Sequence, residues 1–302
     1  MRVLVTGGTG FIGERLCREL DDRGHDVTAL ARNPDGADLP ADVDRETGDV
    51  TAYDSIESAF EGQDAVVNLV ALSPLFKPKG GATHESVHLG GTENVVRAAE
   101  EHDVDRIVQM SALGADPDGP TAYIRTKGQA EAVVTESDPA WTIVRPSVVF
   151  GEGGEFVSFT KKLTPPVLAP LPGGGKTRFQ PIWVGDIVPM LADCVEDDDH
   201  VGETYEIGGP EVLTLAQVAK LARRAAGQPV TVVPVPMALA GIGLKVAGSI
   251  PGFPMGADQY RSLKFDNTTA SNDVGAFGRS EGDLTTLSSH LGVDARGGTR
   301  DM

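Results

Sequence analysis

Three side chains near the middle of the sequence have the types and spacing of a proton-transfer site. Tyr123 and Lys127 are four residues apart, so on a helix they lie on one face. There the phenol could donate or accept a proton, and the ammonium group would lower its pKa. Ser111 directly follows a predicted strand and could hold a substrate oxygen. Because many helices contain a Tyr-x-x-x-Lys pair by chance, the alternative is that these residues only bind a cofactor.

A glycine-rich segment early in the chain predicts which kind of cofactor that is. It lies between a predicted strand that ends at Val5 and a predicted helix, and its glycines are Gly7, Gly10 and Gly13. In this setting the first permits a tight turn, the second lets the backbone approach a pyrophosphate, and the third lets the helix pack closely on the sheet. The N–H groups that begin the helix favour the anion. We therefore predict a bound nicotinamide dinucleotide, with Lys127 on its ribose and with contacts from Thr6, Gly7, Gly10, Phe11, Ile12 and Gly13.

The end of the second predicted strand bears on which dinucleotide binds. An acidic residue about 20 positions beyond the glycines would select NAD by its ribose hydroxyl. Here the chain has Arg32 instead, whose planar guanidinium can pair with the 2′-phosphate of NADP. We therefore expect NADP(H), with NAD(H) as the alternative if Arg32 is only a solvated surface residue. Asp49 is placed to accept from the adenine amino group, or else only forms a turn. Val50, Val70 and Ala71 complete the expected cofactor contacts.

The charge balance excludes some classes of partner. The chain has 302 residues, of which 44 are acidic and 26 basic, for a formal net charge of -18 and a pI near 4.6. Such a surface repels nucleic acid and anionic lipid. With only nine lysines the composition resembles that of proteins from salt-loving archaea, the alternative being an ordinary acidic protein. Cys17 and Cys194 are isolated and no export signal is evident, so we expect a cytoplasmic protein.

Hydrophobic patterning predicts an α/β fold with a Rossmann-type, doubly wound parallel sheet. We expect residues 1–150 to form the dinucleotide-binding domain, residues 151–293 a smaller substrate or partner lobe, interleaved with the first or separate, and residues 294–302 a flexible tail. Predicted strands are Val3–Val5, Val27–Ala31, Ala65–Val70, Arg106–Met110 and Trp141–Arg145. Predicted helices are Gly13–Asp22, Tyr53–Phe60, Glu85–His102, Thr121–Ser137 and Thr214–Ala226.

Two further features leave alternatives open. The apolar run 237–250 is too short to cross a bilayer, which needs about 20 residues. It could dock on the protein's own lobe, or it could make a peripheral contact with a membrane or a partner. His84 and His88 are four residues apart, as in a zinc-binding pair on a helix, but no third ligand suggests itself. We therefore expect a solvated or core helix face and no metal.

Taken together, these motifs resemble an extended or atypical short-chain dehydrogenase/reductase over roughly residues 1 to 190. Further matching segments are Gly91-Thr92-Glu93-Asn94, Arg145-Pro146-Ser147-Val148-Val149-Phe150-Gly151 and Pro181-Ile182-Trp183-Val184-Gly185-Asp186. The resemblance implies that Pro146, Ser147 and Val148 form the wall of the nicotinamide pocket.

Two local features resemble one subgroup, that of the short-chain-dehydrogenase-like accessory subunit of respiratory complex I. They are Asn68-Leu69-Val70, where sugar-nucleotide epimerases usually have His-Ala-Ala, and the segment from Asp258-Gln259 to Leu263 and Asp266-Asn267. The resemblance implies an NADPH-dependent oxidoreductase with a small-molecule substrate. A non-catalytic, cofactor-holding accessory or assembly protein with a redox-complex partner is the alternative. A nucleotide-sugar epimerase or dehydratase is a second alternative, disfavoured because the second half offers few arginines for a diphosphate.

Overall fold

The structure is a computed structural model that describes residues 1–76, 80–237 and 261–293, and the chain divides into two compact units. The first unit comprises Met1–Leu72, Pro78–Pro146 and Gly185–Glu206, and the second comprises Ser73–Lys77, Ser147–Val184 and Ile207–Met302. The boundary predicted at residue 150 differs from this division. The later segment Gly185–Glu206 belongs to the first unit and contributes to a strand of its sheet. The tail 294–302 and nearly all of the apolar run 237–250 lie outside the described residues.

A seven-stranded sheet forms the centre of the first unit, in the order β3-β2-β1-β4-β5-β6-β11. The strand pairs from β3 to β6 are all parallel. The order reverses between β1 and β4, which is where ligands of doubly wound sheets bind. The strands are β1 (Arg2–Thr6), β2 (Asp26–Ala31), β3 (Asp44–Thr47), β4 (Ala65–Asn68), β5 (Arg106–Met110), β6 (Ala140–Pro146) and β11 (Glu203–Ile207).

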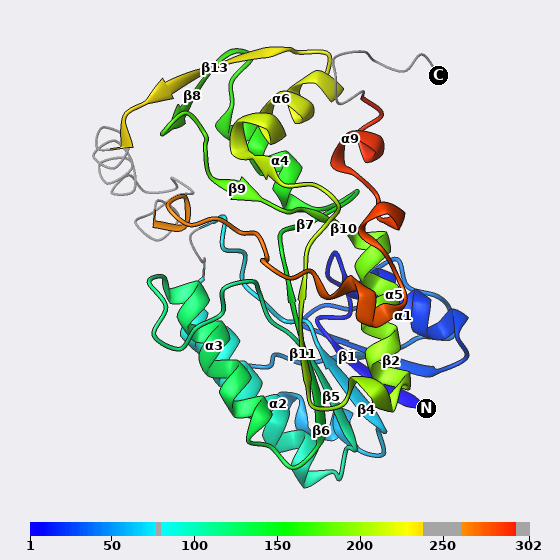
Figure 1. The fold of residues 1–302 in the computed structure, drawn as a ribbon. Coiled ribbons are helices and arrows are strands. Elements are labelled where there is room, and N and C mark those ends of the chain that lie inside the picture. The colour runs from blue at the N-terminus through cyan, green and yellow to red at the C-terminus, as the bar shows by residue number, and fades with distance from the viewer. Residues whose placement is uncertain (77–79, 238–260, 294–302) are drawn as a thin grey trace. The chain divides into compact units, whose positions relative to one another are not determined.

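Helices cover both faces of this sheet: α2 and α3 lie on one face and α1 and α5 on the other (Figure 1). They are α1 (Gly13–Asp22), α2 (Gly90–Glu101), α3 (Ala122–Thr135) and α5 (Val184–Glu196). On the side of α1 and α5, Arg23 joins the two helices by ion pairs with Asp193 at 2.8 Å and Glu196 at 2.6 Å. Short helical turns are Tyr53–Ser55, Glu57–Phe60, Glu85–Leu89 and Asp198–His200.

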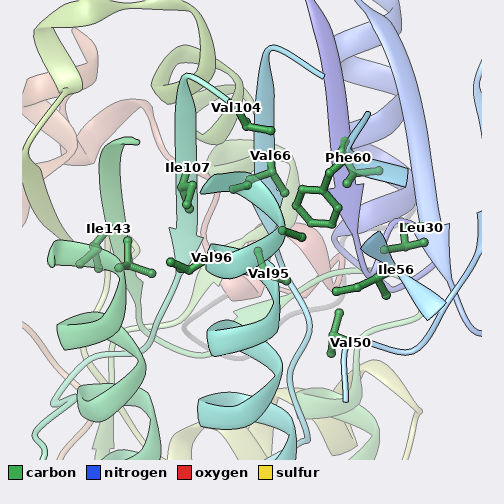
Figure 2. Close-up of a cluster of buried hydrophobic side chains, with 14 residues drawn as sticks. Leu30, Val50, Ile56, Phe60, Val66, Val95, Val96, Val104, Ile107 and Ile143 are labelled. Carbon is green, nitrogen blue, oxygen red and sulfur yellow. The ribbon is translucent and has the colours of Figure 1, made fainter. Parts of the chain in front are cut away.

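The two central strands are buried at every position because helices cover both faces. Ala65–Asn68 and Arg106–Met110 therefore lack the alternation of apolar and polar residues seen in half-exposed strands. The side chains that β4 and β5 turn toward α2 join a core centred on the fully buried Phe60 (Figure 2). Burying one such phenylalanine contributes about 1.5–3 kcal/mol relative to leaving it exposed.

Three predicted elements differ from those in the structure. The predicted helix Glu85–His102 begins as the π-helical turn Glu85–Leu89 and is α-helical only over Gly90–Glu101. The predicted helix Tyr53–Phe60 is two 3₁₀ segments, Tyr53–Ser55 and Glu57–Phe60. The Ser55 hydroxyl donates to the carbonyl of Ala52 at 2.7 Å, a local bond that competes with α-helical pairing. The predicted strand Ala65–Val70 ends at Asn68, because the next residues leave the sheet and line a cavity.

The second unit is built from short strands around two packed helices, α4 (Glu155–Leu163) and α6 (Leu215–Ala225). Its core contains Phe150, Phe156 and Val218. The other elements are β7 (Val149–Phe150), β8 (Val167–Pro172), β9 (Arg178–Phe179), β10 (Ile182–Trp183), β12 (Leu213–Thr214), β13 (Val230–Val235), α9 (Leu287–His290) and the 3₁₀ turns Asp273–Phe277 and Glu281–Asp283.

Candidate functional site

The glycine turn between β1 and α1 has the tight geometry that its sequence predicts. Gly7 has φ +75°, a conformation that glycine adopts without steric cost. A Cβ atom on Gly13 would lie 2.2 Å from the Gly7 carbonyl oxygen, so only glycine lets α1 begin this close to the turn. Ile12 stands at the N-cap of α1 and no side chain caps that end. Phe11 lies beside it, with the Arg15 guanidinium 5.0 Å from its ring centroid. The N-terminus of α1 is therefore suited to an anion.

A cavity of about 860 Å³ opens beside this turn, entirely within the first unit. Its volume lies within the range of cofactor sites. It brings together the predicted residues Gly7, Gly10, Arg32, Asp49, Val50, Val70 and Ala71. Sequence reasoning missed other lining residues, namely Thr9, Leu30, Ala31, Asn33, Gly48, Thr51, Leu69, Leu72, Gly80, Gly81, Ala82, Ser86 and Val87. Most of these are chain neighbours of predicted ones, but the last five come from a segment without a readable motif.

Thr6, which the sequence predicts as a cofactor contact, begins a buried hydrogen-bond chain across the sheet. Its hydroxyl donates to Asn68 Oδ1 at 2.7 Å, and Asn68 Nδ2 donates to Gln109 Oε1 at 2.9 Å. All three side chains are at most 3% exposed. Buried polar groups satisfied in this way fix the relative positions of β1, β4 and β5 at the edge where the cavity opens.

The segment Gly91–Asn94 holds one wall of the cavity. A Cβ atom on Gly91 would lie 2.8 Å from Val50 Cγ2, so glycine is needed for α2 to pack against the cavity residue Val50. Asn94 Nδ2 donates to the Val50 carbonyl at 2.7 Å. Thr92 Oγ1 accepts from Asn68 Nδ2 at 3.3 Å. Three of the four residues of this motif thus have a structural role beside the cavity.

Arg32 and Asp49 lie at neighbouring strand ends on the cavity lining. Arg32 is exposed, and within the described part of the chain no hydrogen bond or ion pair to its guanidinium is found. Asp49 Oδ1 accepts from the backbone N–H of Thr51 at 3.0 Å and from its hydroxyl at 2.8 Å, so this residue does form the turn. Burial raises the pKa of Asp49, but the bonds from Thr51 and the charge of Arg32 outweigh it and the net pKa is lowered. The carboxylate is therefore anionic and lines the cavity as well.

Lys127 bonds to the last residue of β5, Met110, which Ser111 follows in the chain. Lys127, on α3, is 2% exposed, and its Nζ donates to the Met110 carbonyl at 2.7 Å. The neighbouring Ser111 is 4% exposed, and its hydroxyl has no hydrogen-bond partner among the described residues. Burial lowers the pKa of Lys127 to about 8, although the charge of Glu131 opposes the shift. A buried cation therefore bonds to the carbonyl of the residue before Ser111, and the Ser111 hydroxyl is itself buried and unsatisfied.

Tyr123 lies one turn before Lys127 on α3, and is half-buried. Burial raises the pKa of its phenol to about 12, so the expected lowering by Lys127 is not found in the structure, where the ammonium group instead donates to Met110. The tyrosine ring packs edge-on against His84 and His88, with centroid distances of 5.6 and 5.3 Å and interplanar angles of 83°. The sequence favoured a solvated or core helix face for these histidines over a zinc-binding pair, but it did not indicate a contact with Tyr123.

The predicted pocket wall after β6 divides between the two units, with Pro146 in the first and Ser147 and Val148 in the second. In the second unit, Asn267 Oδ1 accepts from the Ser147 hydroxyl at 2.7 Å and from the Val148 N–H at 3.0 Å. The Asp266 carboxylate accepts from the backbone N–H and from Nε of Arg178, both at 2.8 Å. The Asp266-Asn267 pair thus fixes the strand ends of the second unit.

Across 1–76, 80–237 and 261–293, no three or more His, Cys, Asp or Glu side chains lie together as metal ligands would. Nor does any helix in those ranges have the length and apolar character needed to cross a membrane.

Comparison with curated proteins finds relatives in two functional settings. Subunit 9 of the mitochondrial NADH dehydrogenase (ubiquinone) 1 alpha subcomplex from Arabidopsis thaliana is 29% identical over 229 residues, which cover 72% of this chain and 56% of that protein. This chain therefore spans little more than half the length of that relative. A 3 beta-hydroxysteroid dehydrogenase/Delta 5→4-isomerase of Mycobacterium tuberculosis is 31% identical over 265 residues, or 75% of this chain and 70% of that protein.

Solved structures show the same fold. The UDP-glucose 4-epimerase of Thermus thermophilus, in complex with NAD, superposes with a TM-score of 0.65 and 25% identity, over 78% of this chain and 86% of that one. The Rossmann-type sheet predicted from the sequence is thereby confirmed.

The family comparison covers the site directly. Residues 7–166, more than half of the chain, match the family described as NAD(P)H-binding. The match includes the glycine turn, Arg32, Asp49, Ser111 and the Tyr123–Lys127 pair. The chain has the fold of a short-chain dehydrogenase/reductase and belongs to the NAD(P)H-binding family.

Proposed function

We propose that this chain is an NADP(H)-dependent oxidoreductase that interconverts a carbonyl compound and an alcohol at Ser111, Tyr123 and Lys127. The observation that supports this most directly is the bond from Lys127 Nζ to the Met110 carbonyl at 2.7 Å. It holds a buried cation beside Ser111, whose hydroxyl is buried without a hydrogen-bond partner among the described residues. Buried polar groups are normally satisfied, so an unsatisfied one beside a cation is suited to a ligand oxygen.

The residues of the first unit fit the cofactor. The cavity is lined by the glycine turn, and the start of α1 offers uncapped N–H groups to a pyrophosphate. We infer that Asp49 and Arg32, which both line the cavity, contact the adenosine and a 2′-phosphate, and the exposed Arg32 supports NADP(H) over NAD(H). When bound, NADPH supplies two electrons as a hydride to the carbonyl carbon.

Side chains of this protein would then bind the carbonyl oxygen and supply its proton. The Ser111 hydroxyl donates a hydrogen bond to that oxygen. Tyr123 is protonated at neutral pH because its pKa is about 12, and it transfers its phenolic proton to the oxygen as the alcohol forms. Lys127, with a pKa of about 8, is mainly cationic at pH 7 and would bond the nicotinamide ribose. Water returns the proton to Tyr123, and the hydride and this proton balance the reduction.

The test is oxidation of NADPH with a panel of carbonyl and quinone acceptors. Replacing Tyr123 by Phe removes the proton donor, so kcat/KM should fall by about a hundredfold or more while NADPH still binds. Tyr53→Phe, which removes a phenol near the surface, is the matched control and should keep full activity. Turnover that survives in Tyr123→Phe would contradict the assignment of the proton donor.

A second candidate function is a non-catalytic accessory protein that holds the cofactor within a redox complex. The similarity to the Arabidopsis complex I subunit favours it. In that case NADPH should remain bound through purification and should not be oxidised by any acceptor. It should also bind equally well to Tyr123→Phe. Interconversion of UDP-sugars without net oxidation of the nicotinamide would instead indicate an epimerase.

A further inference from the structure

His88 lies between the dinucleotide cavity and the helix that carries Tyr123. It belongs to the π-helical turn Glu85–Leu89, which leads directly into α2. Ser86 and Val87 of the same turn line the cavity, whereas His88 is buried with only 1% of its surface exposed. Single π-helical turns occur frequently at functional sites. His88 therefore lies next to the cavity wall without lining the cavity itself.

The two ring nitrogens have different partners, and these determine the tautomer. Nε2 lies 2.9 Å from the backbone nitrogen of Leu72 and accepts its N–H. Nδ1 lies 3.1 Å from Thr126 Oγ1, and the Thr126 hydroxyl donates to a backbone carbonyl of its own helix, with that of Ala122 at 2.8 Å and that of Tyr123 at 3.2 Å. Since Nε2 must offer a lone pair and Thr126 offers one to Nδ1, only the neutral ring with its hydrogen on Nδ1 satisfies all three bonds.

The surroundings of His88 agree with a neutral ring. Burial lowers its pKa most, followed by the charge of Lys127 and by His84, to about 2. The His88 ring also contacts Tyr123 edge-on at 5.3 Å and His84 at 5.0 Å between centroids. One uncharged side chain therefore contacts Leu72 on the cavity wall, Thr126 on α3 and the phenol ring of Tyr123.

We propose that His88 is a positioning residue that couples the cavity wall to the Tyr123–Lys127 helix. As the Nδ1–H imidazole it accepts from Leu72 and donates to Thr126, so the wall that a bound dinucleotide contacts and the helix that presents the phenol are held by one rigid ring. The purpose of this coupling rests on the proposed function, whereas the hydrogen bonds of His88 are the same whether or not the protein turns over a substrate.

The first measurement is the tautomer of His88 in the full-length wild-type protein, read from the nitrogen-15 shifts of its ring. The expected signature is a protonated Nδ1 and an unprotonated Nε2 that stay unchanged between about pH 5 and pH 8, where an ordinary histidine titrates. An Nε2–H ring, or one that titrates in this range, would overturn the proposal.

Two variants then separate the two bonds, with NADPH as the probe. His88→Gln can keep an acceptor near Leu72 but loses the donor to Thr126, and His88→Asn does the reverse. We expect His88→Asn to weaken NADPH binding by about fivefold, the effect of one ordinary hydrogen bond, and His88→Gln to bind as the wild type does. Ultraviolet titration of Tyr123 should shift in His88→Gln, because the bond between the His88 ring and α3 is lost.

A ring substitution at the neighbouring histidine is the control. His84→Phe keeps an aromatic edge against Tyr123 and should leave NADPH binding unchanged. Wild-type NADPH binding in both His88 variants, together with an unshifted Tyr123 titration, would show that His88 is only a core residue. If the wild-type protein itself fails to bind NADPH, the proposed function fails, and the tautomer and the Tyr123 titration still decide the role of His88.

Discussion

Single residues at strand ends determine how the cavity would recognise its ligand. Gly7 and Gly13 allow the backbone to turn and the helix to begin beside it. Asp49 has a double role, since it forms its own turn through Thr51 and also faces the cavity. Arg32 is exposed, with no hydrogen bond or ion pair found within the described ranges. An arginine available in this way can bind a phosphate without first losing another bond.

Replacing Arg32 by Ala should therefore change the choice of dinucleotide. We expect NADPH to bind about tenfold to a hundredfold more weakly, the effect of a charge-assisted bond to phosphate, with little change for NADH. Fluorescence titration of both nucleotides measures this. The control is Arg97→Ala, which removes an exposed arginine that lies on α2. Equal weakening for NADPH and NADH would contradict the role of Arg32.

His88 should also make the protein sensitive to acid. Its pKa in the folded chain, about 2, lies below the ordinary value of 6.5, so the unfolded chain binds the proton more readily. The lowered pKa of His88 therefore contributes to the free energy of unfolding above about pH 6.5, and this contribution is lost as the pH falls toward 2. Between pH 7 and pH 5 this amounts to about 2 kcal/mol. Urea unfolding at the two pH values should show a decrease that is larger in the wild type by this amount than in His88→Gln. Equal decreases would mean that the buried ring accepts a proton.

At the scale of elements, the ends of β1, β4 and β5 are joined by side chains rather than by backbone alone. The chain of bonds from Thr6 through Asn68 to Gln109 crosses the point where the strand order reverses. The glycine turn and the strand that precedes Ser111 are thus held in register. In the second unit the equivalent role belongs to Asn267, which bonds to Ser147 and Val148.

The α6 helix offers a test of local stability. Thr214 Oγ1 accepts from the Gln217 N–H at 3.2 Å, and Gln217 Oε1 accepts from the Thr214 N–H at 2.8 Å, which is a capping box. Thr214→Ala should lower the free energy of unfolding by about 1 kcal/mol, and Thr214→Ser should restore most of it. Urea denaturation is the measurement. An alanine variant as stable as the serine variant would show that the cap contributes nothing.

The formal net charge of the whole molecule, -18, determines how its stability should depend on salt. Repulsion among so many carboxylates opposes a compact chain, and dissolved salt screens it. We therefore expect stability to rise with salt, as the Debye length falls from about 10 Å at 0.1 M to about 3 Å at 1 M. Thermal unfolding in potassium chloride over this range checks the expectation, together with loss of structure on dialysis into low salt. An unfolding midpoint that does not depend on salt would contradict a halophilic character.

The sequence by itself determined the features that arise from neighbours along the chain. The bounds of α1 at Gly13–Asp22 and of β5 at Arg106–Met110 agree with those predicted, because periodicity and glycine spacing are local signals. The glycine turn, the sheet and the NAD(P)H-binding family could be predicted for the same reason.

Only the tertiary structure decided what depends on segments distant in sequence. Thr6 donates a hydrogen bond to Asn68, and the boundary between the two units falls between Pro146 and Ser147. The rings of His84 and His88 pack against the ring of Tyr123. Spacing along one helix showed that the two histidines share a face, but not what that face meets. The bonds of His88 to Leu72 and Thr126 join residues 16 and 38 positions away, and such contacts form only when the whole sheet and its helices are packed.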